Sequence, residues 1–142
     1  MGNEYYNPEE EAKYLGLKIS FIKLKKLNSF ILEKIIYLRE NMNKAEKRCS
    51  LTYEVVKYAW NKYNHFEQAG WHSKNVENII KQQTARKLIS PVEFDKLYQN
   101  KVSFDEMEEE LEVTKEYLLH YLNYCKTINL IENKKLTYSL TR

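Results

Sequence analysis

Apolar residues spaced three and four positions apart predict a helix over residues 50–60, near the middle of the chain. Its apolar stripe consists of Leu51, Val55, Tyr58 and Ala59. Such a stripe is typical of a helix that packs one face against a core. We therefore interpret residues 50–60 as a central helix around which the other elements are organised.

Shorter patterns before the central helix predict one further helix and several strands. After an asparagine cap, Pro8 suits the first turn of a helix, and Gly16 suits its end. Apolar positions that roughly alternate with polar ones predict a half-buried strand over residues 17–24. The apolar runs 30–32 and 35–38, separated by two charged residues, predict a hairpin or two short paired strands.

After the central helix, the sequence predicts mostly further helices. Their approximate ranges are 74–89, 91–97, 103–113 and 114–125. Ser103 followed by Glu106 forms a capping box, which supports the start of the third of these helices. A strand over residues 135–140 is predicted to close the chain.

The order of one helix, a few strands and then mostly helices predicts the α+β class. A chain of 142 residues is long enough for one domain with its own core, so we expect a single domain over residues 1–142. Residues from about 9 to 100 form its main part, and about 101–142 form a helical C-terminal subregion.

The composition excludes several classes of protein. Hydrophobic residues make up 43% of the chain, which indicates a folded protein and not a disordered one. No run approaches the roughly 18 apolar residues of a membrane span, and the acidic start of the chain does not resemble a secretion signal. Cys49 and Cys125, far apart in sequence, predict reduced thiols in a cytoplasmic protein. A net charge of +3, with lysine and glutamate mixed throughout, gives little reason to expect nucleic-acid binding.

The face opposite the apolar stripe carries Tyr53, Glu54 and Lys57 at positions i, i+1 and i+4. These are the offsets at which an H-E-x-x-H helix presents two zinc ligands and a general base. A phenol and an ammonium group occupy the two histidine positions here. An ammonium has no lone pair, and a phenol with a pKa near ~10 stays protonated at neutral pH, so neither is expected to hold zinc.

Three segments are informative through their order and the intervals between them. They are EAKYLGLKISFIKLKKLNSFILEKIIYLRENMNKAEKRCSLTYEVVK (11–57), KQQTARKLISP (81–91) and VSFDEMEEELEVTKEYLLHYL (102–122). In this order they resemble the ImmA/IrrE family of small zinc peptidases, over about residues 9–130. The resemblance implies a zincin-like core over about 9–100, with a short antiparallel or mixed sheet packed on the central helix. It also implies a helical C-terminal part resembling a helix-turn-helix.

The departures from that family fall on its chemistry. Tyr53 and Lys57 stand at the two histidine positions. Ile80 stands where the resemblance places the third, acidic ligand, and Glu77 is the nearest acidic alternative. Only Glu54, at the position of the general base, matches. Without the metal a bound water keeps a pKa near ~15.7 instead of about 7, so we expect an inactive peptidase homologue without metal or cofactor.

Lys57 raises a sharper hypothesis, because its ammonium lies one turn from Glu54. It could supply the positive charge that the metal supplies in the resembled family. The alternative is an ordinary helix-surface pair at i, i+3, worth about 0.2–0.5 kcal/mol. A Lys57→Ala substitution that left the thermal stability unchanged would rule out the first interpretation.

Two other features of the sequence are weaker candidates for a functional site. His65, Glu67 and His72 bracket a loop, but their spacing matches no standard metal site, so solvated loop residues are the favoured interpretation. Cys49 has no histidine at a supporting offset, so a structural thiol is favoured over a nucleophile.

Residues 103–124 also fit the apolar skeleton of a helix-turn-helix, with Thr114 at the start of the would-be recognition helix. Glu112 stands where the tight turn of that motif usually has glycine. Six acidic residues between positions 105 and 112 would face the DNA phosphates. DNA binding is therefore an alternative and not the main expectation.

The same segment is a candidate surface for a basic protein partner, because opposite charges steer and orient association. Its candidate residues are Glu108, Glu109, Glu112, Tyr117, Tyr121 and Tyr124. Active members of the resembled family act on repressors of mobile elements or stress regulons, and a copy without zinc ligands could still bind such a protein. We expect a non-catalytic regulatory factor that binds a repressor, recombinase or sigma-type factor of a phage or other mobile element. A DNA-binding regulator and a residual metal-dependent hydrolase are the alternatives.

Overall fold

The computed structural model describes residues 6–64 and 73–140. Within these residues the chain forms six helices and three strands, which confirms the α+β class. The elements are α1 (Pro8–Tyr14), β1 (Lys18–Ile22), β2 (Ser29–Leu32), β3 (Ile35–Arg39), α2 (Lys44–Asn64), α3 (Ser73–Leu88), α4 (Pro91–Gln99), α5 (Phe104–Leu111) and α6 (Lys115–Leu140). None of the described helices combines the length and the apolar character that a membrane span needs.

The first helix begins and ends at the residues that the sequence indicated. The Asn7 side chain accepts a hydrogen bond from the Glu10 N–H at 3.1 Å, and Pro8 occupies the first turn. Gly16 lies just past the helix at φ +79°, a left-handed conformation that glycine adopts without strain. Local sequence signals therefore determine both ends of α1.

The three strands form a mixed sheet in the order β1-β3-β2. β2 and β3 are antiparallel and are joined by Glu33 and Lys34, both at positive φ, as a two-residue hairpin requires. This confirms the predicted hairpin. β1 pairs with β3 in parallel, so β2 is an edge strand whose second side pairs with no other strand of the described residues.

The central helix begins at Lys44, before the predicted start at residue 50. The Asn43 side chain accepts from the Glu46 N–H at 2.8 Å, and the Glu46 carboxylate accepts from the Asn43 N–H at 3.0 Å. This reciprocal capping box starts the helix inside the charged stretch that the sequence left as an approach segment.

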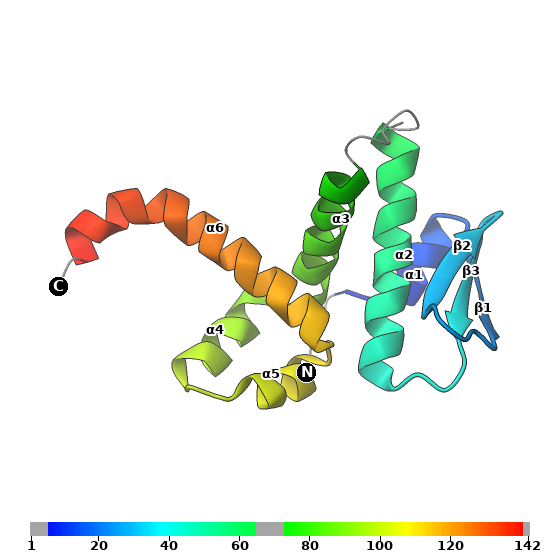
Figure 1. Ribbon diagram of the computed structural model, residues 1–142, viewed down its shortest axis with the longest axis horizontal. Coiled ribbons are helices and arrows are strands. Elements are labelled where there is room, and N and C mark those ends of the chain that lie inside the picture. The colour runs from blue at the N-terminus through cyan, green and yellow to red at the C-terminus, as the bar shows by residue number, and fades with distance from the viewer. Residues whose placement is uncertain (1–5, 65–72, 141–142) are drawn as a thin grey trace.

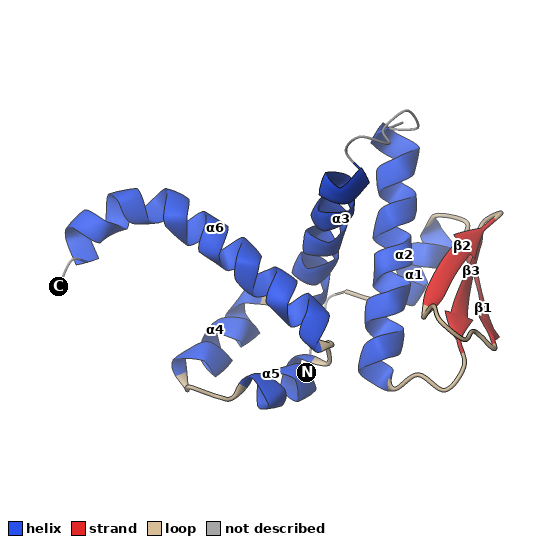
Figure 2. Cartoon of the chain, in the orientation of Figure 1, coloured by secondary structure: helices blue, strands red, loops and turns tan. Residues whose placement is uncertain are grey.

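α2 separates two hydrophobic cores. In Figure 1 the sheet lies on one side of α2, and α3 to α6 lie on the other; Figure 2 shows the strands grouped on that first side. The sheet-side core contains Ala12, Leu17, Ile36, Leu38, Leu51 and Val55. The larger helix-side core includes Cys49, Leu88, Phe94, Met107, Leu111, Val113, Tyr117, Leu118 and Tyr121. Opposite faces of α2 contribute to both.

Arg48 joins α2 to the C-terminal ends of two other helices. Its guanidinium donates to the carbonyl of Leu88 at 3.0 Å, at the end of α3. It also donates to the carbonyls of Leu111 at 3.3 Å and Glu112 at 3.2 Å, at the end of α5. Carbonyls at a helix C-terminus lack partners within the helix, so one side chain supplies donors at the ends of both helices.

The predicted closing strand over residues 135–140 is wrong, because α6 continues to Leu140. No glycine or proline interrupts residues 115–140, and none of the described strands pairs with this segment. The first turns of α6 pack against α3, whereas its C-terminal half extends away from the rest of the molecule (Figure 1).

Candidate functional site

A cleft of about 410 Å³ lies where α2, the edge strand β2 and the helical half of the molecule meet. Residues 27–31 form one of its walls. The other walls carry side chains of α2, α3 and the start of α6, among them Tyr53, Glu77 and Glu116. The volume falls in the range of roughly 300–1,000 Å³ that is typical of ligand sites. The cleft therefore contains the motif positions on α2 that the sequence singled out.

Tyr53 and Glu77 meet directly across the cleft. The Tyr53 hydroxyl donates to Glu77 Oε2 at 2.6 Å, which joins α2 to α3. Burial raises the pKa of the Tyr53 phenol above its ordinary value of 10.0, and the hydrogen bond to Glu77 and the charge of Glu77 raise it further. Tyr53 thus stays protonated and acts as a donor to Glu77.

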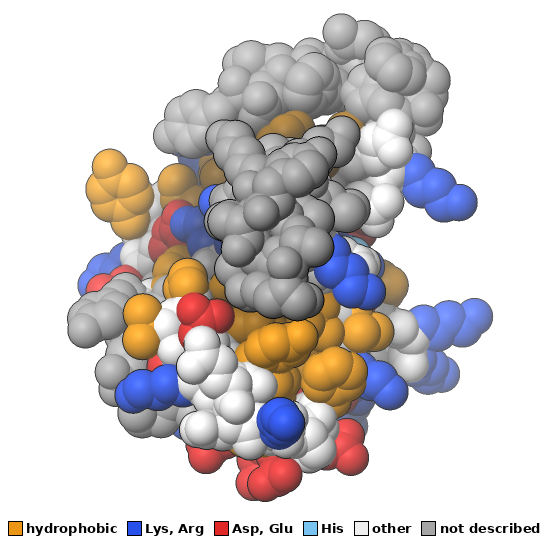
Figure 3. Space-filling model, turned by 90° about the vertical axis from the view of Figure 1, so that its left-hand side faces the viewer, with side chains coloured by type: hydrophobic (Ala, Val, Ile, Leu, Met, Phe, Trp, Pro, Cys, Tyr) orange, Lys and Arg blue, Asp and Glu red, His pale blue; other side chains and the backbone are white. Residues whose placement is uncertain are grey.

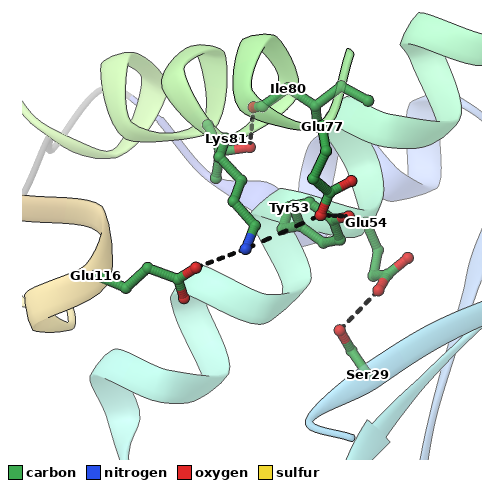
Figure 4. Close-up of polar contacts among 8 residues, drawn as sticks. Ser29, Tyr53, Glu54, Glu77, Ile80, Lys81 and Glu116 are labelled. Atoms are coloured by element: carbon green, nitrogen blue, oxygen red, sulfur yellow. Dashed lines mark hydrogen bonds and ion pairs between the residues drawn. The ribbon is translucent and has the colours of Figure 1, made fainter. Parts of the chain in front are cut away.

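Lys81 carries the cation that connects the walls of the cleft. Its Nζ lies 2.6 Å from Glu116 Oε2 on α6 and 3.9 Å from Glu77 Oε2 on α3. Figure 4 shows the ammonium group between the two carboxylates, beside the Tyr53–Glu77 hydrogen bond. One lysine therefore balances two acids that come from different helices.

Ile80, the expected position of the third ligand, does not line the cleft. It is 2% exposed and lies on the same face of α3 as the fully buried Thr84 and Leu88, four and eight residues further on. Glu77 and Lys81 share the cleft-facing side instead. Of the two candidates for the third position, Glu77 is therefore the one that lines the cleft and contacts Tyr53.

Glu54 is the most enclosed charged group of the cleft, at 2% exposure. The Ser29 hydroxyl of β2 donates to Glu54 Oε2 at 2.7 Å (Figure 4). The other oxygen, Oε1, is shielded from solvent and has no hydrogen-bond partner among the described residues. Burial raises the pKa of the Glu54 carboxyl above 4.5, and this outweighs the lowering by the Ser29 hydrogen bond and the Lys57 charge.

Lys57 is not the ion-pair partner of Glu54 in the described part of the chain. Its Nζ lies over the Tyr53 ring, 5.6 Å from the ring centroid, in a cation–π contact. Its charge acts on Glu54 from a distance and lowers the pKa of that carboxyl. The sequence suggested Lys57 as the cation beside the carboxylates of the cleft. In the structure Lys81 is the cation that lies closest to two of them, those of Glu77 and Glu116.

The donor set of the cleft does not fit the zinc ion that the resemblance implies. The Tyr53 hydroxyl donates a hydrogen bond to Glu77, the Lys57 ammonium has no lone pair, and Glu54 accepts a hydrogen bond from Ser29. In the two described ranges no three histidine, cysteine or acidic side chains cluster in a way that could hold a metal. We therefore derive no metal-dependent step for this site.

Cys49 lines the same cleft and contacts the start of α6. It is 1% exposed, and its Sγ accepts a hydrogen bond from the Thr114 N–H at 3.4 Å, at the start of α6. Burial raises the pKa of the thiol from 9.0 to about 11. The second sequence candidate, His65 with Glu67 and His72, lies outside the described residues.

Two tyrosines of the predicted partner surface are core residues. Tyr117 is 6% exposed and Tyr121 is 5% exposed, because this side of α6 packs into the helix-side core. The Tyr121 ring meets the Phe94 ring edge-on, with centroids 4.9 Å apart. Tyr124 is half-buried under the Arg86 guanidinium, 4.3 Å from its ring centroid. These rings are therefore not a free partner surface.

The acids of that predicted surface remain accessible. Glu109 is exposed, whereas Glu108 and Glu112 are half-exposed. Glu112 pairs with the exposed Lys44 at 3.4 Å. Figure 3 views the side of the molecule that carries α4, where hydrophobic side chains gather in the lower middle of the face and charged side chains lie toward its edges.

Sequence reasoning missed three residues that make polar contacts across the cleft: Ser29, Lys81 and Glu116. Lys81 stands four residues after Glu77, an i, i+4 pair that a search along the predicted helix could have found. Ser29 reaches Glu54 across 25 positions, and Lys81 reaches Glu116 across 35 positions. Local spacing carries no signal for such long-range contacts.

In comparisons with known proteins, no family model, curated protein or solved structure matches this chain.

Proposed function

We propose that this protein is a non-catalytic interaction factor whose cleft binds an extended segment of a partner protein along the free edge of β2. The observation that carries the proposal is that β2 is an edge strand and that residues 27–31, which include most of it, line the cleft. Extended segments bind such edges by adding a strand, through main-chain hydrogen bonds.

The register of the sheet identifies the groups that would bind such a segment. The Arg39 N–H donates to the Asn28 carbonyl at 2.8 Å, so residues 28 and 39 form a hydrogen-bonded pair. Such pairs occur at every second position of an antiparallel ladder, so Phe30 forms the next one with Tyr37. The N–H and C=O groups of Ser29 and Ile31 then point to the free side of β2. These groups are available to an added strand.

The chemistry of the cleft supports binding over catalysis. Glu77 accepts a hydrogen bond from Tyr53 and lies near Lys81, so these side chains join helices instead of standing unpaired in the cleft. The resemblance to the ImmA/IrrE peptidases adds a class of partner: a repressor, recombinase or sigma-type factor of a mobile element. That part of the proposal rests on the resemblance alone.

Panning a displayed library of random 12-residue peptides on the immobilised protein tests the proposal. We expect selected peptides whose affinity falls at least tenfold with Ile31→Pro, because proline removes the outward N–H but no hydrogen bond of the β2–β3 ladder. The control Ile31→Ala keeps that N–H and should change the affinity by less than about threefold. Failure to select any peptide, or equal binding by Ile31→Pro and Ile31→Ala, would refute edge binding.

The non-catalytic part is tested by elemental analysis after dialysis. We expect far less than one zinc ion per chain, and selected peptides that stay intact by mass spectrometry after prolonged incubation. One zinc per chain together with peptide cleavage would support the hydrolase alternative instead.

DNA binding is a second candidate, favoured by the turn between α5 and α6. Glu112 adopts the left-handed conformation there at φ 54°, and Thr114 precedes α6, as in a helix-turn-helix. The acidic side chains of α5 oppose it, because they would repel phosphates. A shift of duplex DNA at moderate salt that weakens as salt rises would support this candidate.

A further inference from the structure

We infer that the cleft selects a partner segment with a Lys or Arg side chain at the residue that pairs with Ser29, and that this cation binds the Glu54 carboxylate. The inference rests on the proposed function, because it needs an extended segment on the free edge of β2. It adds the chemical class of the recognised side chain and the residue that recognises it.

The sheet register places that side chain beside Glu54. The Ser29 side chain points from β2 toward α2, since its hydroxyl donates to Glu54 Oε2 at 2.7 Å. The residue directly opposite Ser29 on an added strand has its side chain on the same face, with Cβ atoms about 4.5–5.5 Å apart. A long side chain at that position therefore extends toward the carboxylate, whereas its neighbours in sequence point to the other face.

The charge of the cleft fits a cation. Four carboxylates line it, those of Glu46, Glu54, Glu77 and Glu116, against the two ammonium groups of Lys57 and Lys81. Lys81 is bound between two of the acids, and Lys57 lies over the Tyr53 ring. The carboxylate of Glu54 is thus left without an ion pair among the described residues.

Glu54 also has an unused binding position. Its Oε2 accepts from Ser29, but Oε1 is enclosed and has no hydrogen-bond partner in the described part of the chain. A buried carboxylate oxygen without a partner is unfavourable, and a charge-assisted hydrogen bond from an ammonium or guanidinium group would satisfy it. This unpartnered oxygen distinguishes Glu54 from the other acids that line the cleft.

The test pans the random 12-residue library in parallel on the wild-type protein and on Glu54→Gln, after thermal melting has shown that both fold. We expect Lys or Arg at one fixed position of the peptides selected by the wild-type protein, and no such enrichment on Glu54→Gln. Replacing that lysine by norleucine in a selected peptide should weaken binding to the wild-type protein at least tenfold, and binding to Glu54→Gln by less than threefold.

A control variant and the contrary outcomes separate the two proposals. Glu109→Gln, on α5 and outside the cleft, should keep the full effect of norleucine. Selected peptides that need the β2 edge but tolerate norleucine would overturn the cation inference and leave the proposed function standing. A library that yields no peptide would overturn both. The norleucine substitution is made in the peptide, so it cannot affect the folding of the protein.

Discussion

Two groups of acidic side chains in this molecule differ in how the fold uses them. The cleft group is Glu54, Glu77 and Glu116. The α5 group is Glu108, Glu109 and Glu112. In the cleft group each carboxylate meets a donor or cation from another element: Ser29, Tyr53 or Lys81. In the α5 group the ion pair that joins Glu112 to an exposed lysine is the only such contact among the described residues.

The comparison shows that acidic density in a sequence does not locate a site. The α5 acids are close together in sequence, but α5 is attached to the rest of the molecule by other groups: its apolar face and the carbonyls at its end. The cleft acids are scattered over residues 54–116, and only the fold brings them together. Their contacts are buried or bridge elements, so their substitution should change stability and pH dependence more.

The largest effect is expected for Arg48→Met, which removes the guanidinium that attaches α5 and α3 to α2. Three carbonyls, those of Leu88, Leu111 and Glu112, lose a donor. We expect the free energy of unfolding to fall by about 2–4 kcal/mol, measured by urea denaturation. Lys44→Met removes the ion pair to Glu112 and should change stability by less than about 0.5 kcal/mol. Equal losses in both variants would show that the α5 side chains, and not the backbone, hold this helix.

Tyr53→Phe should have the second largest effect. It removes the hydroxyl that donates to Glu77 at 2.6 Å and leaves that carboxylate with Lys81 at 3.9 Å. Hydrogen bonds to charged groups contribute about 1.5–3 kcal/mol, and Glu77 keeps some solvent contact, so we expect a loss of about 1–2 kcal/mol. The control Tyr98→Phe alters an exposed tyrosine and should be nearly neutral. A neutral Tyr53→Phe would mean that the contact between α2 and α3 depends on packing alone.

Glu54→Gln should stabilise the protein at neutral pH by roughly 1 kcal/mol, because it removes a buried charge. In the folded state the pKa of the Glu54 carboxyl is raised above its ordinary value of 4.5. At any pH between 4.5 and this raised pKa, the folded protein therefore binds more protons than the unfolded chain. Wild-type stability therefore falls as pH rises through that interval and is unaffected by this group below it.

Chemical denaturation of wild type and Glu54→Gln from pH 4 to pH 8 measures this difference. The free energy of unfolding of Glu54→Gln should exceed that of the wild-type protein by its maximum amount at pH values above the raised pKa. This difference should disappear as the pH falls toward 4.5. An advantage that stays constant over the whole interval would show that the pKa of Glu54 is not raised.

Elements with local signals were predictable from the sequence, whereas contacts between distant segments were not. The hairpin at Glu33-Lys34 and the capping box at Ser103 were found, because each depends on a few adjacent residues. The closing strand was wrong because the final segment lacks a breaker and simply continues α6. The start of α2 was missed because the Asn43–Glu46 box lies in a charged stretch without an apolar stripe.

The candidate site was predictable on α2 and not beyond it. Tyr53, Glu54 and Lys57 line the cleft because their spacing on one helix fixes their common face. The third position, expected at Ile80 on α3, does not line the cleft, because Ile80 is buried, whereas the alternative Glu77 does line it. The burial of the α6 tyrosines was hidden because aromatic residues suit cores and interfaces equally well.

The smallest effect is expected for the double variant Glu108→Gln, Glu109→Gln on α5. Neither carboxylate has a hydrogen bond or ion pair to another element within residues 6–64 and 73–140, and surface substitutions of this kind usually change stability by less than about 0.5 kcal/mol. Urea denaturation should confirm this, and peptides selected on the wild-type protein should bind unchanged. If binding instead falls several-fold, partner recognition extends from the cleft to α5, and the acidic surface that the sequence singled out belongs to the binding site after all.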